Sequence, residues 1–342
     1  MSELKVYITD YEYASLQEEE KELEKADLKL IPKQCKSEND VIKQCNDAVG
    51  LLNQYAPITR KVIEALPNLK VVARYGVGVN TIDLDAATEH GVCVLNVPDY
   101  CMDEVSNQAF LLMLACQRKL IMLNDQVQNG SWDYKISKPI YRLAGQTMGL
   151  LGFGRIPRIL AEKARAFGIK ILIYDPYLRQ SDVDSFGATL LPLQEVLKKA
   201  DMLSVHVPLT KDTYHLIGEK EFALMKKHAV IVNTSRGQLI DEEALYKALK
   251  SKQLAGAGLD VMTNEPIEKE SKLLGLPNVI ITPHVAWYSE EAEKELKRKA
   301  AHGVVTILSG YDTENIVNYD IRKKLSLKKK TERGFFDVGC NH

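Results

Sequence analysis

Short apolar runs alternate with stretches of helical periodicity along most of the chain. In the first hundred residues the apolar runs predict five strands, at residues 6–8, 28–31, 48–52, 71–73 and 92–95. Helices are predicted between these strands, over 12–25 and after each of Ser37, Thr59 and Asp83. Strands that alternate with helices favour a parallel sheet covered on both faces. This part of the chain is therefore predicted to form an α/β domain of its own.

A second alternating series follows a long apolar helix predicted over 103–129 and a connecting loop over 131–143. Its strands are predicted at residues 148–153, 169–174, 202–207, 229–232, 255–259 and 279–281. Polar residues come directly after several of these strands, and they include His206, Thr234, Arg236, Asp260 and His284. Ligands of parallel α/β sheets bind at the carboxyl ends of the strands. The pattern predicts a second doubly wound sheet whose carboxyl edge carries a binding site.

The stretch 147–176 has the layout of a βαβ unit with a glycine turn. Gly152 would allow a sharp turn, and Gly154 would leave no side chain between the backbone and a pyrophosphate. The helix that follows offers unpaired N–H groups at its start. Asp175 stands about 20 residues further on, where an acid accepts hydrogen bonds from ribose hydroxyls. Because a carboxylate repels a 2′-phosphate, NAD is predicted over NADP; the alternative is a glycine turn that binds nothing.

Two glycines one residue apart, Gly76 and Gly78, follow a strand of the first domain. Successive backbone N–H groups there would suit a small carboxylate, and a plain strand-to-helix turn is an equal alternative. Arg60, Lys61 and Arg74 are near enough in sequence to admit a phosphorylated or dicarboxylate substrate, or are ordinary surface charges.

Composition excludes several classes of protein. The 342 residues carry 45 basic and 46 acidic side chains, so bulk charge indicates neither nucleic acid nor an anionic membrane as a partner. No apolar run is long enough to span a bilayer, and a cytoplasmic protein is expected. Six cysteines without metal-ligand spacing predict reduced, mostly buried thiols and no metal site. The basic stretch 321–330 is expected to be a solvated, partly mobile end.

Three ionisable residues at or just beyond strand ends describe a carbonyl reduction. Arg236 offers a planar fork for a carboxylate, and His284 can give or take the proton that accompanies hydride transfer. Glu265 would hold the imidazole in one tautomer. Each alone also has a structural interpretation, but together at one sheet edge they favour catalysis.

A series of motifs in order between about residues 50 and 295 resembles the D-isomer-specific 2-hydroxyacid dehydrogenases. These are RYGVGVN, GLLGFGRIP with YDP, HVPLT, NTSRG, LDVMTNEP and TPHVAWYSEEA. The resemblance implies that Arg236 binds substrate, His284 is the acid/base, Glu265 supports it, and the Val77 and Gly78 backbone receives the carboxylate. It also implies cofactor contacts by Arg155, Ile156, Asp175, Val207, Pro208, Thr213, Thr234 and Asp260. Gly152, Gly154 and His206 are predicted to join them from their places in the glycine turn and after a strand.

The same resemblance implies a Rossmann-type NAD domain and a flavodoxin-like substrate domain with the active site in the cleft between them. Residues 1–102 would begin the substrate domain, 103–290 would form the NAD domain, and 291–342 would return to the substrate domain and end in the basic tail. A homodimer built on the cofactor domains is expected.

Within the family, YDPYL and AWYSEEA are similar to the branch that contains the C-terminal binding protein corepressors and bacterial relatives. Trp287, one helical turn after His284, would then wall the substrate pocket, with core packing as the alternative. Two departures stand out: Pro157 in place of the third glycine, which leaves close packing of helix on strand less assured, and residues 105–108, which lack an acid and a histidine found in many members.

The sequence thus predicts an NAD-dependent enzyme that interconverts a small D-2-hydroxy acid and its 2-oxo acid, with reduction as the physiological direction. Two alternatives also fit the sequence: a redox-responsive NAD(H)-binding regulatory protein of the corepressor type, and an oxidoreductase of the same family acting on formate or phosphite.

Overall fold

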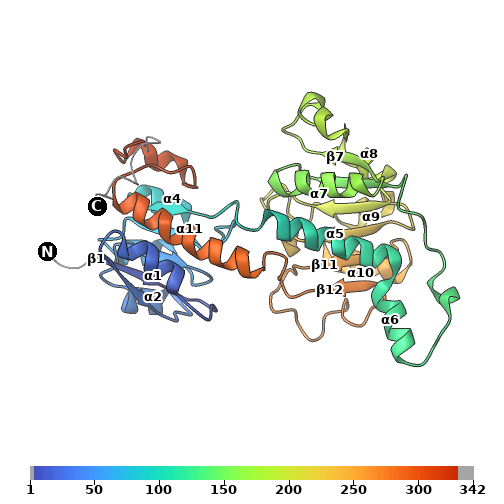
Figure 1. Cartoon of the computed structure of the whole chain (residues 1–342), viewed down its shortest axis with the longest axis horizontal. Coiled ribbons are helices and arrows are strands. Elements are labelled where there is room, and N and C mark those ends of the chain that lie inside the picture. The colour runs from blue at the N-terminus through green and yellow to red at the C-terminus, as the bar shows by residue number, and fades with distance from the viewer. Residues whose placement is uncertain (1–3, 330–342) are drawn as a thin grey trace, which may run out of the picture. The chain divides into compact units, whose positions relative to one another are not determined.

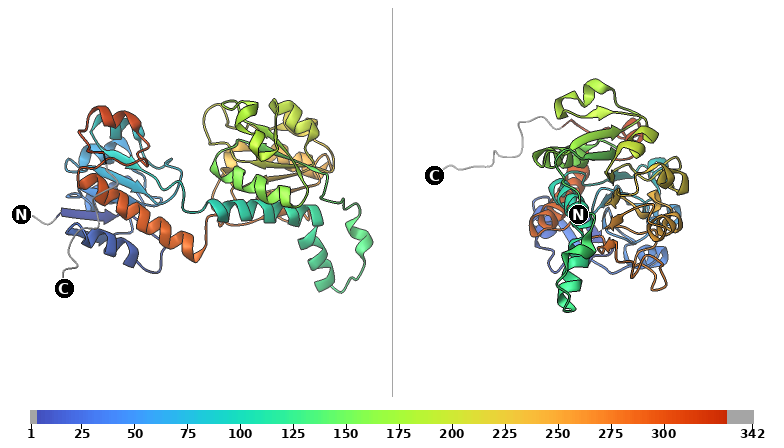
Figure 2. Two further views of the ribbon diagram at one scale, coloured as in Figure 1. Left: turned by 45° about the horizontal axis from the view of Figure 1, so that its top comes forward. Right: turned by 90° about the vertical axis from the view of Figure 1, so that its right-hand side faces the viewer.

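The computed structural model describes residues 4–329, and these divide into two compact units. Unit 1 combines the residues up to Tyr100 with those from Ser289 onward, and unit 2 spans Cys101–Tyr288. No helix within the described part is both long and apolar enough to cross a membrane. Figure 1 labels the elements of both units, and Figure 2 gives two further views.

Unit 1 is built on a five-stranded parallel sheet in the order β2-β1-β3-β4-β5. Its strands are β1 (Leu4–Ile8), β2 (Leu28–Pro32), β3 (Gly50–Asn53), β4 (Val71–Arg74) and β5 (Cys93–Leu95). This is the flavodoxin-like strand order. All five strands predicted in this region are present, because each contains a short apolar run, which is fully buried in β3 and β5 and least buried in the edge strand β2.

Helices cover both faces of this sheet. One face carries α1 (Gln17–Glu24) and α11 (Glu290–Leu308), and the other carries α2 (Glu38–Gln44), α3 (Arg60–Ala65) and α4 (Leu84–Glu89). Ser37 and Asp83 cap α2 and α4 as predicted, since their side chains accept the backbone N–H of Asp40 and Ala86. Helix α1 begins at Gln17 rather than at residue 12.

The chain returns to unit 1 through α11, and the segment after it is packed. Ile321 in the short helix η5 (Tyr319–Lys323) is fully buried, and Arg322 pairs with Asp312 at 3.1 Å. Tyr311 forms a bridge to Lys328. Several basic side chains of residues 321–328 are exposed, as expected of a solvated end, but the buried Ile321 and the bridge at Lys328 attach this stretch to the rest of unit 1. Residue 330 lies outside the described residues.

Unit 2 holds a seven-stranded parallel sheet in the order β12-β11-β10-β9-β6-β7-β8. Its strands are β6 (Thr147–Leu151), β7 (Lys170–Tyr174), β8 (Thr189–Leu190), β9 (Met202–Val205), β10 (Val230–Asn233), β11 (Gly256–Leu259) and β12 (Val279–Ile281). The order reverses between β6 and β9, and such a switch point is where open α/β sheets bind ligands. The prediction of two doubly wound parallel sheets is confirmed.

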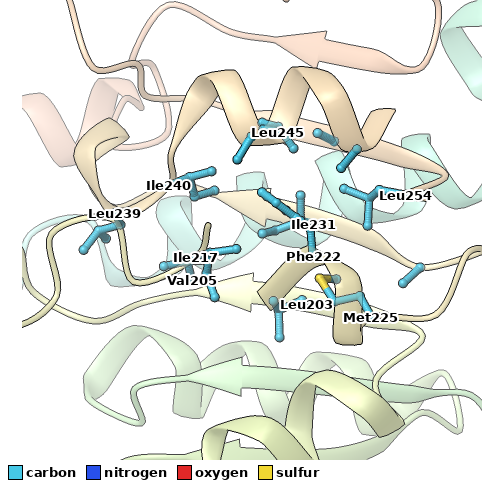
Figure 3. Packing of buried hydrophobic residues seen from close by; sticks show 14 of the residues in the cluster. Leu203, Val205, Ile217, Phe222, Met225, Ile231, Leu239, Ile240, Leu245 and Leu254 are labelled. Carbon is cyan, nitrogen blue, oxygen red and sulfur yellow. The ribbon is translucent and has the colours of Figure 1, made fainter. Parts of the chain in front are cut away.

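Both faces of the unit 2 sheet are covered. Helices α5 (Met102–Arg118) and α7 (Arg155–Ala166) pack on one face. Helices α8 (Leu193–Lys199), α9 (Glu219–Leu224) and α10 (Glu242–Lys250) pack on the other. Figure 3 shows the second layer, where Leu245 of α10 and Phe222 of α9 meet Leu203 and Ile231 of the sheet. This apolar layer anchors the strands whose carboxyl ends carry the polar loops.

The long helix predicted over 103–129 is two helices. Helix α5 ends at Arg118, Lys119 adopts a left-handed conformation (φ 53°), and α6 (Leu120–Gln128) follows in a new direction. No glycine or proline marks the break, so the sequence could not reveal it. Unlike α5, α6 has no buried residue. It projects with the segment after it from the rest of unit 2 (Figures 1 and 2).

Asp201 ties the amino ends of neighbouring strands in unit 2. Its carboxylate accepts hydrogen bonds from the backbone N–H of Thr147 (2.8 Å), from Lys226 Nζ (2.7 Å) and from His228 Nε2 (2.9 Å). Burial disfavours the charged form, but these three donors outweigh it and lower the pKa of Asp201.

We predict that Asp201→Asn lowers the free energy of unfolding by about 1.5–3 kcal/mol at pH 7, because a charged hydrogen-bond partner is lost. Since the folded pKa lies below the unfolded value of about 3.9, this contribution is fully present above pH 4 and disappears as pH falls through the folded pKa. Urea unfolding between pH 7 and pH 3 measures it, with exposed Asp212→Asn as the control. An equal effect of the two substitutions would contradict the prediction.

Candidate active site

The glycine turn after β6 has the geometry that the fingerprint predicts. Gly152 has φ +86°, and a Cβ there would stand 3.0 Å from the carbonyl oxygen of His206. Gly154 is the N-cap of α7, and a Cβ there would meet nothing within 4 Å. The first residue is thus required for the turn, and the second leaves open space in front of the helix N-terminus.

Pro157 lies in the first turn of α7 and is buried. An N–H at this position would have no intrahelical partner, so proline costs the helix no hydrogen bond. Leu160, Ala161 and Ala164 are fully buried against the sheet layer. Close packing of this helix therefore does not need the third glycine, and the small side chains of Ala161 and Ala164 provide it. Arg155 and Ile156 supply the two N–H groups before the proline.

Asp175 follows β7 and faces the glycine turn. Its Oδ2 accepts the backbone N–H of Phe153 at 3.0 Å, and its Oδ1 accepts that of Tyr177 at 3.0 Å. Two backbone donors fix the orientation of the carboxylate beside the turn. Each oxygen keeps a further lone pair, which is what a ribose diol requires.

The loop after β9 contains His206, Val207, Pro208 and Thr213. His206 Nε2 lies 2.8 Å from Ser204 Oγ, and burial lowers the pKa of His206 to about 4, so the imidazole is neutral at physiological pH. The Thr213 hydroxyl donates to the carbonyl oxygen of Pro208 (2.6 Å) and accepts the N–H of Thr210 (2.8 Å). Thr213 therefore closes this loop through its side chain, and Val207 in the same loop is buried.

The loop after β10 presents Thr234 and Arg236. Asn233 shapes it: its side-chain amide donates to the carbonyl oxygen of Arg236 (2.8 Å) and accepts the N–H of Ser235 (3.0 Å). Arg236 is half-buried, and its Nη1 donates to the carbonyl oxygen of Ser235 at 2.6 Å.

Gly237 was not singled out from the sequence, yet it fixes how two loops meet. A Cβ on Gly237 would stand 1.9 Å from the carbonyl carbon of Met262, so the two backbones touch directly. Gln238 Nε2 donates to the carbonyl oxygen of Thr263 across the same contact (2.9 Å). The glycine of the NTSRG motif was the available signal, but its partner loop could not be read from the sequence.

Glu265 and His284 are brought together. His284 Nδ1 donates to Glu265 Oε2 at 2.7 Å, and Glu265 Oε1 accepts the backbone N–H of Met262 at 3.0 Å. Burial raises the pKa of Glu265, but the hydrogen bonds and the positive charges of His284 and Arg236 outweigh it and leave that pKa lowered. An ionised carboxylate therefore stands against Nδ1, and Nε2 is left for other partners.

Asp260 is buried at the end of β11, and its carboxylate is used within the protein. It accepts hydrogen bonds from the Thr282 hydroxyl (2.5 Å) and from the backbone N–H groups of Val285 (3.0 Å) and Ala286 (2.9 Å). Thr282 was not among the predicted site residues. The contact shows that Asp260 organises the loop that carries His284.

Trp287 lies in a turn, and α11 begins only at Glu290, so the expectation that it stands one helical turn after His284 is wrong. The partly buried indole packs edge-on against Tyr288 with ring centroids 5.5 Å apart. Instead of a helical turn, this segment has the backbone N–H groups of residues 285 and 286 bound to the Asp260 carboxylate.

Val77 and Gly78 belong to unit 1, at the carboxyl end of β4. Gly76 before them has φ +129°, and Asn96 Nδ2 donates to the carbonyl oxygen of Val77 at 2.8 Å. Val77 is exposed. A Cβ on Gly76 would stand 1.7 Å from Arg74 Nη1, so the guanidinium lies directly over this turn.

The unit 2 residues fit a dinucleotide. The glycine turn admits a close anion, the first-turn N–H groups of α7 lack intrahelical partners, and Asp175 is oriented beside them. Thr234 is buried, and its hydroxyl oxygen has no hydrogen-bond partner among residues 4–329, which a polar ligand group would supply. Among residues 4–329 no three His, Cys, Asp or Glu side chains are grouped so that they could hold a metal ion.

Comparisons with known proteins agree with this geometry. Residues 110–286 match the family described as D-isomer specific 2-hydroxyacid dehydrogenase, NAD binding domain. Glyoxylate reductase of Korarchaeum cryptofilum is 39% identical over 82% of this chain and 85% of its own length. D-3-phosphoglycerate dehydrogenase of Methanocaldococcus jannaschii is 42% identical over 82% of this chain, which spans 54% of that longer protein.

A solved structure is similar along nearly the whole chain. D-lactate dehydrogenase from Aquifex aeolicus, complexed with NAD and lactic acid, has a TM-score of 0.80 and 29% identity over 94% of this chain and 98% of that one. The predicted cofactor, NAD, is confirmed by the family match. The chain belongs to the D-isomer specific 2-hydroxyacid dehydrogenase family and is an NAD-dependent oxidoreductase.

Proposed function

We propose that the protein reduces a small 2-oxo acid to the D-2-hydroxy acid with NADH. The observation that carries this proposal is the pair His284–Glu265, 2.7 Å apart, with the charge of Arg236 acting on the same carboxylate. A proton donor, a carboxylate that orients it and a cation for a substrate carboxylate are the groups that this reduction needs.

Each of the three residues has a distinct role in the proposed reaction. The Arg236 guanidinium binds the substrate carboxylate with its planar fork. The Glu265 carboxylate accepts a hydrogen bond from Nδ1–H of His284 and so fixes the tautomer and the orientation of the ring. His284 Nε2 then gives its proton to the carbonyl oxygen of the substrate as the alcohol forms. NADH, when bound, supplies the hydride to the carbonyl carbon.

Residues of the glycine turn and the strand ends would hold the cofactor. The N–H groups of Arg155 and Ile156 face the pyrophosphate in this proposal, and Asp175 accepts hydrogen bonds from the ribose hydroxyls. Val207, Pro208 and Thr234 line the same sheet edge. His206 contributes a neutral ring, because a charged one is disfavoured by its burial.

The alternatives differ from this proposal in their substrates. A regulatory NAD(H)-binding protein needs no proton donor, and the intact pair of Glu265 and His284 favours catalysis over it. Formate or phosphite oxidation involves no carbonyl to protonate. Initial rates with NADH and glyoxylate, hydroxypyruvate or pyruvate, and with NAD and formate or phosphite, distinguish the three. Turnover of only the last two donors would overturn the proposal.

We predict that His284→Ala lowers kcat by about 10²- to 10⁴-fold, because the carbonyl oxygen loses its proton donor. NADH binding, followed by fluorescence titration, should change less than about threefold, since the dinucleotide groups are untouched. His90→Ala, at the surface of unit 1, is the control. Near-normal turnover of His284→Ala would remove the mechanism.

Arg74 is the cation that could extend the substrate range. Arg60 pairs with Glu89 at 2.6 Å and Lys61 with Glu38 at 2.9 Å, so both are committed to surface ion pairs. Arg74 instead lies over the Gly76 turn and has no salt bridge in the described part of the chain. Arg74 therefore belongs to the same turn as the Val77 and Gly78 backbone, to which the family resemblance assigns the substrate carboxylate, and we assign a second anionic group to its guanidinium.

We predict that Arg74→Met raises KM for phosphohydroxypyruvate by about 10- to 100-fold, the equivalent of one charge-assisted hydrogen bond. KM for glyoxylate, which has no second anionic group, should change less than about threefold. Arg60→Met serves as the matched control. Equal losses for both substrates would show that Arg74 does not discriminate between them.

We also propose a homodimer, formed through the arm that comprises α6 and residues 129–143. No residue of α6 is buried, and the arm exposes Leu120, Ile121, Trp132 and Tyr134, with Trp132 90% exposed. Beside α6 lies a cavity of about 130 Å³ lined by Cys116, Ile121, Met122 and Ile280 among others. Large exposed apolar side chains gathered on one projecting arm are typical of an interaction surface, and a second copy of the arm would cover them.

We predict a dimer by light scattering after gel filtration, and dissociation of that dimer by the double substitution Ile121→Asp and Trp132→Asp, which places charges in the apolar contact. Tyr177→Asp, at a site 93% exposed in unit 2 but off the arm, should leave the dimer intact. A wild-type monomer at micromolar concentration would contradict the proposal.

The thiols support a cytoplasmic location in this proposal. Cys35, Cys45, Cys93, Cys101 and Cys116 are all free, and four of them are buried. Cys340 lies outside the described residues. Chains without disulfides are typical of reducing compartments.

A further inference from the structure

The backbone of His284 is held in an unusual conformation. His284 has φ +54°, in the left-handed region that residues other than glycine rarely adopt. Such a conformation persists only where its surroundings enforce it, and it is concentrated at functional sites. The direction of the imidazole depends on this backbone, because it sets where the Cα–Cβ bond points.

Asp260 provides most of that enforcement. The His284 N–H donates to the backbone carbonyl of Asp260 at 2.8 Å. Its carboxylate receives the N–H groups of Val285 and Ala286, the two residues after the histidine. Three successive N–H groups are thus directed at one buried residue, which is 1% exposed.

Thr282 connects this arrangement to helix α5. Its hydroxyl donates to Asp260 Oδ1 at 2.5 Å and accepts from Gln108 Nε2 at 3.2 Å. The two hydrogen bonds run in one direction, from Gln108 through Thr282 to Asp260. The amide nitrogen of Gln108 can only donate, the carboxylate of Asp260 only accepts, and the hydroxyl of Thr282 does both. Gln108 belongs to residues 105–108, which depart from the common pattern of the family. Two other residues of this segment, Ser106 and Asn107, accept hydrogen bonds from Lys163 Nζ instead, at 2.7 and 2.6 Å.

We propose that Gln108, Thr282 and Asp260 form a hydrogen-bonded chain that sets the backbone of His284, so that Thr282 and Gln108 act as positioning residues for the imidazole. This rests on the proposed function, in which His284 protonates the substrate. The chain gives α5 a direct connection to the site: a shift of Gln108 changes the donor to Thr282, and through Asp260 the direction of the ring. Asp260 then positions the proton donor His284, in addition to the cofactor contact that the family resemblance implies for it.

Thr282→Val and Thr282→Ser test the proposal as a matched pair. Valine keeps the shape of threonine but neither donates nor accepts, whereas serine keeps the hydroxyl. We expect Thr282→Val to lower kcat by about 10- to 100-fold through misplacement of the ring. Thr282→Ser should keep kcat within about threefold of the wild type. KM for glyoxylate and the Kd for NADH should change less than about threefold in both.

Substitutions on α5 test the same hydrogen-bonded chain independently, at a residue that does not touch the reacting atoms. Gln108→Leu should lower kcat by about three- to tenfold, and Gln108→His should restore it, because an imidazole N–H can reach the same oxygen. Asn107→Leu, on the same helix but bound to Lys163, should leave kcat unchanged. Thermal unfolding of every variant identifies those that fail to fold. If Thr282→Val fails to fold, the kcat values of Gln108→Leu and Gln108→His test the proposal instead.

The outcomes separate this inference from the function on which it rests. Wild-type kcat in both Thr282→Val and Gln108→Leu would overturn the hydrogen-bonded chain while leaving the reductase intact. A loss confined to NADH affinity would also overturn it, since Asp260 and Thr282 would then serve the cofactor alone. Absence of turnover in the wild type with every 2-oxo acid would instead reject the proposed function.

Discussion

Direct contact between two backbones organises the candidate active site. Gly237 meets the peptide of Met262 where no side chain fits, and this contact brings the loop of Arg236 against the loop of Glu265. Glu265, in the loop after β11, is in turn hydrogen-bonded to His284, in the loop after β12. Three loops from neighbouring parallel strands converge in this way, because parallel strands present all their carboxyl ends at one edge. The buried apolar layer in Figure 3 keeps those strands in register.

Much of the fold, and the position of the cofactor site, could be predicted from the sequence. Most strands are short apolar runs, and the glycine turn with Asp175 indicated where a dinucleotide would lie. Features that depend on tertiary contacts could not be predicted. The break at Lys119 has no glycine or proline, the packing of Ile321 depends on unit 1, and Thr282 acquires its role only through Asp260. The roles of the site residues, and placement in the branch with the corepressors, stay predictions.

Two departures from the family pattern have physical explanations. Pro157 occupies a helix position whose N–H has no intrahelical partner, and Ala161 and Ala164 provide the close packing that a third glycine would otherwise allow. Residues 106–108 have hydrogen-bond partners of their own, in Lys163 and Thr282.

The most direct test of the central claim is a double-mutant cycle between Glu265→Gln and His284→Ala, measured as kcat for 2-oxo acid reduction. If Glu265 acts through the imidazole, Glu265→Gln lowers kcat by about 10- to 100-fold in the wild type and has no further effect once His284 is alanine. Independent, multiplicative losses in the double variant would show that the two residues do not work as one unit, and would contradict the account.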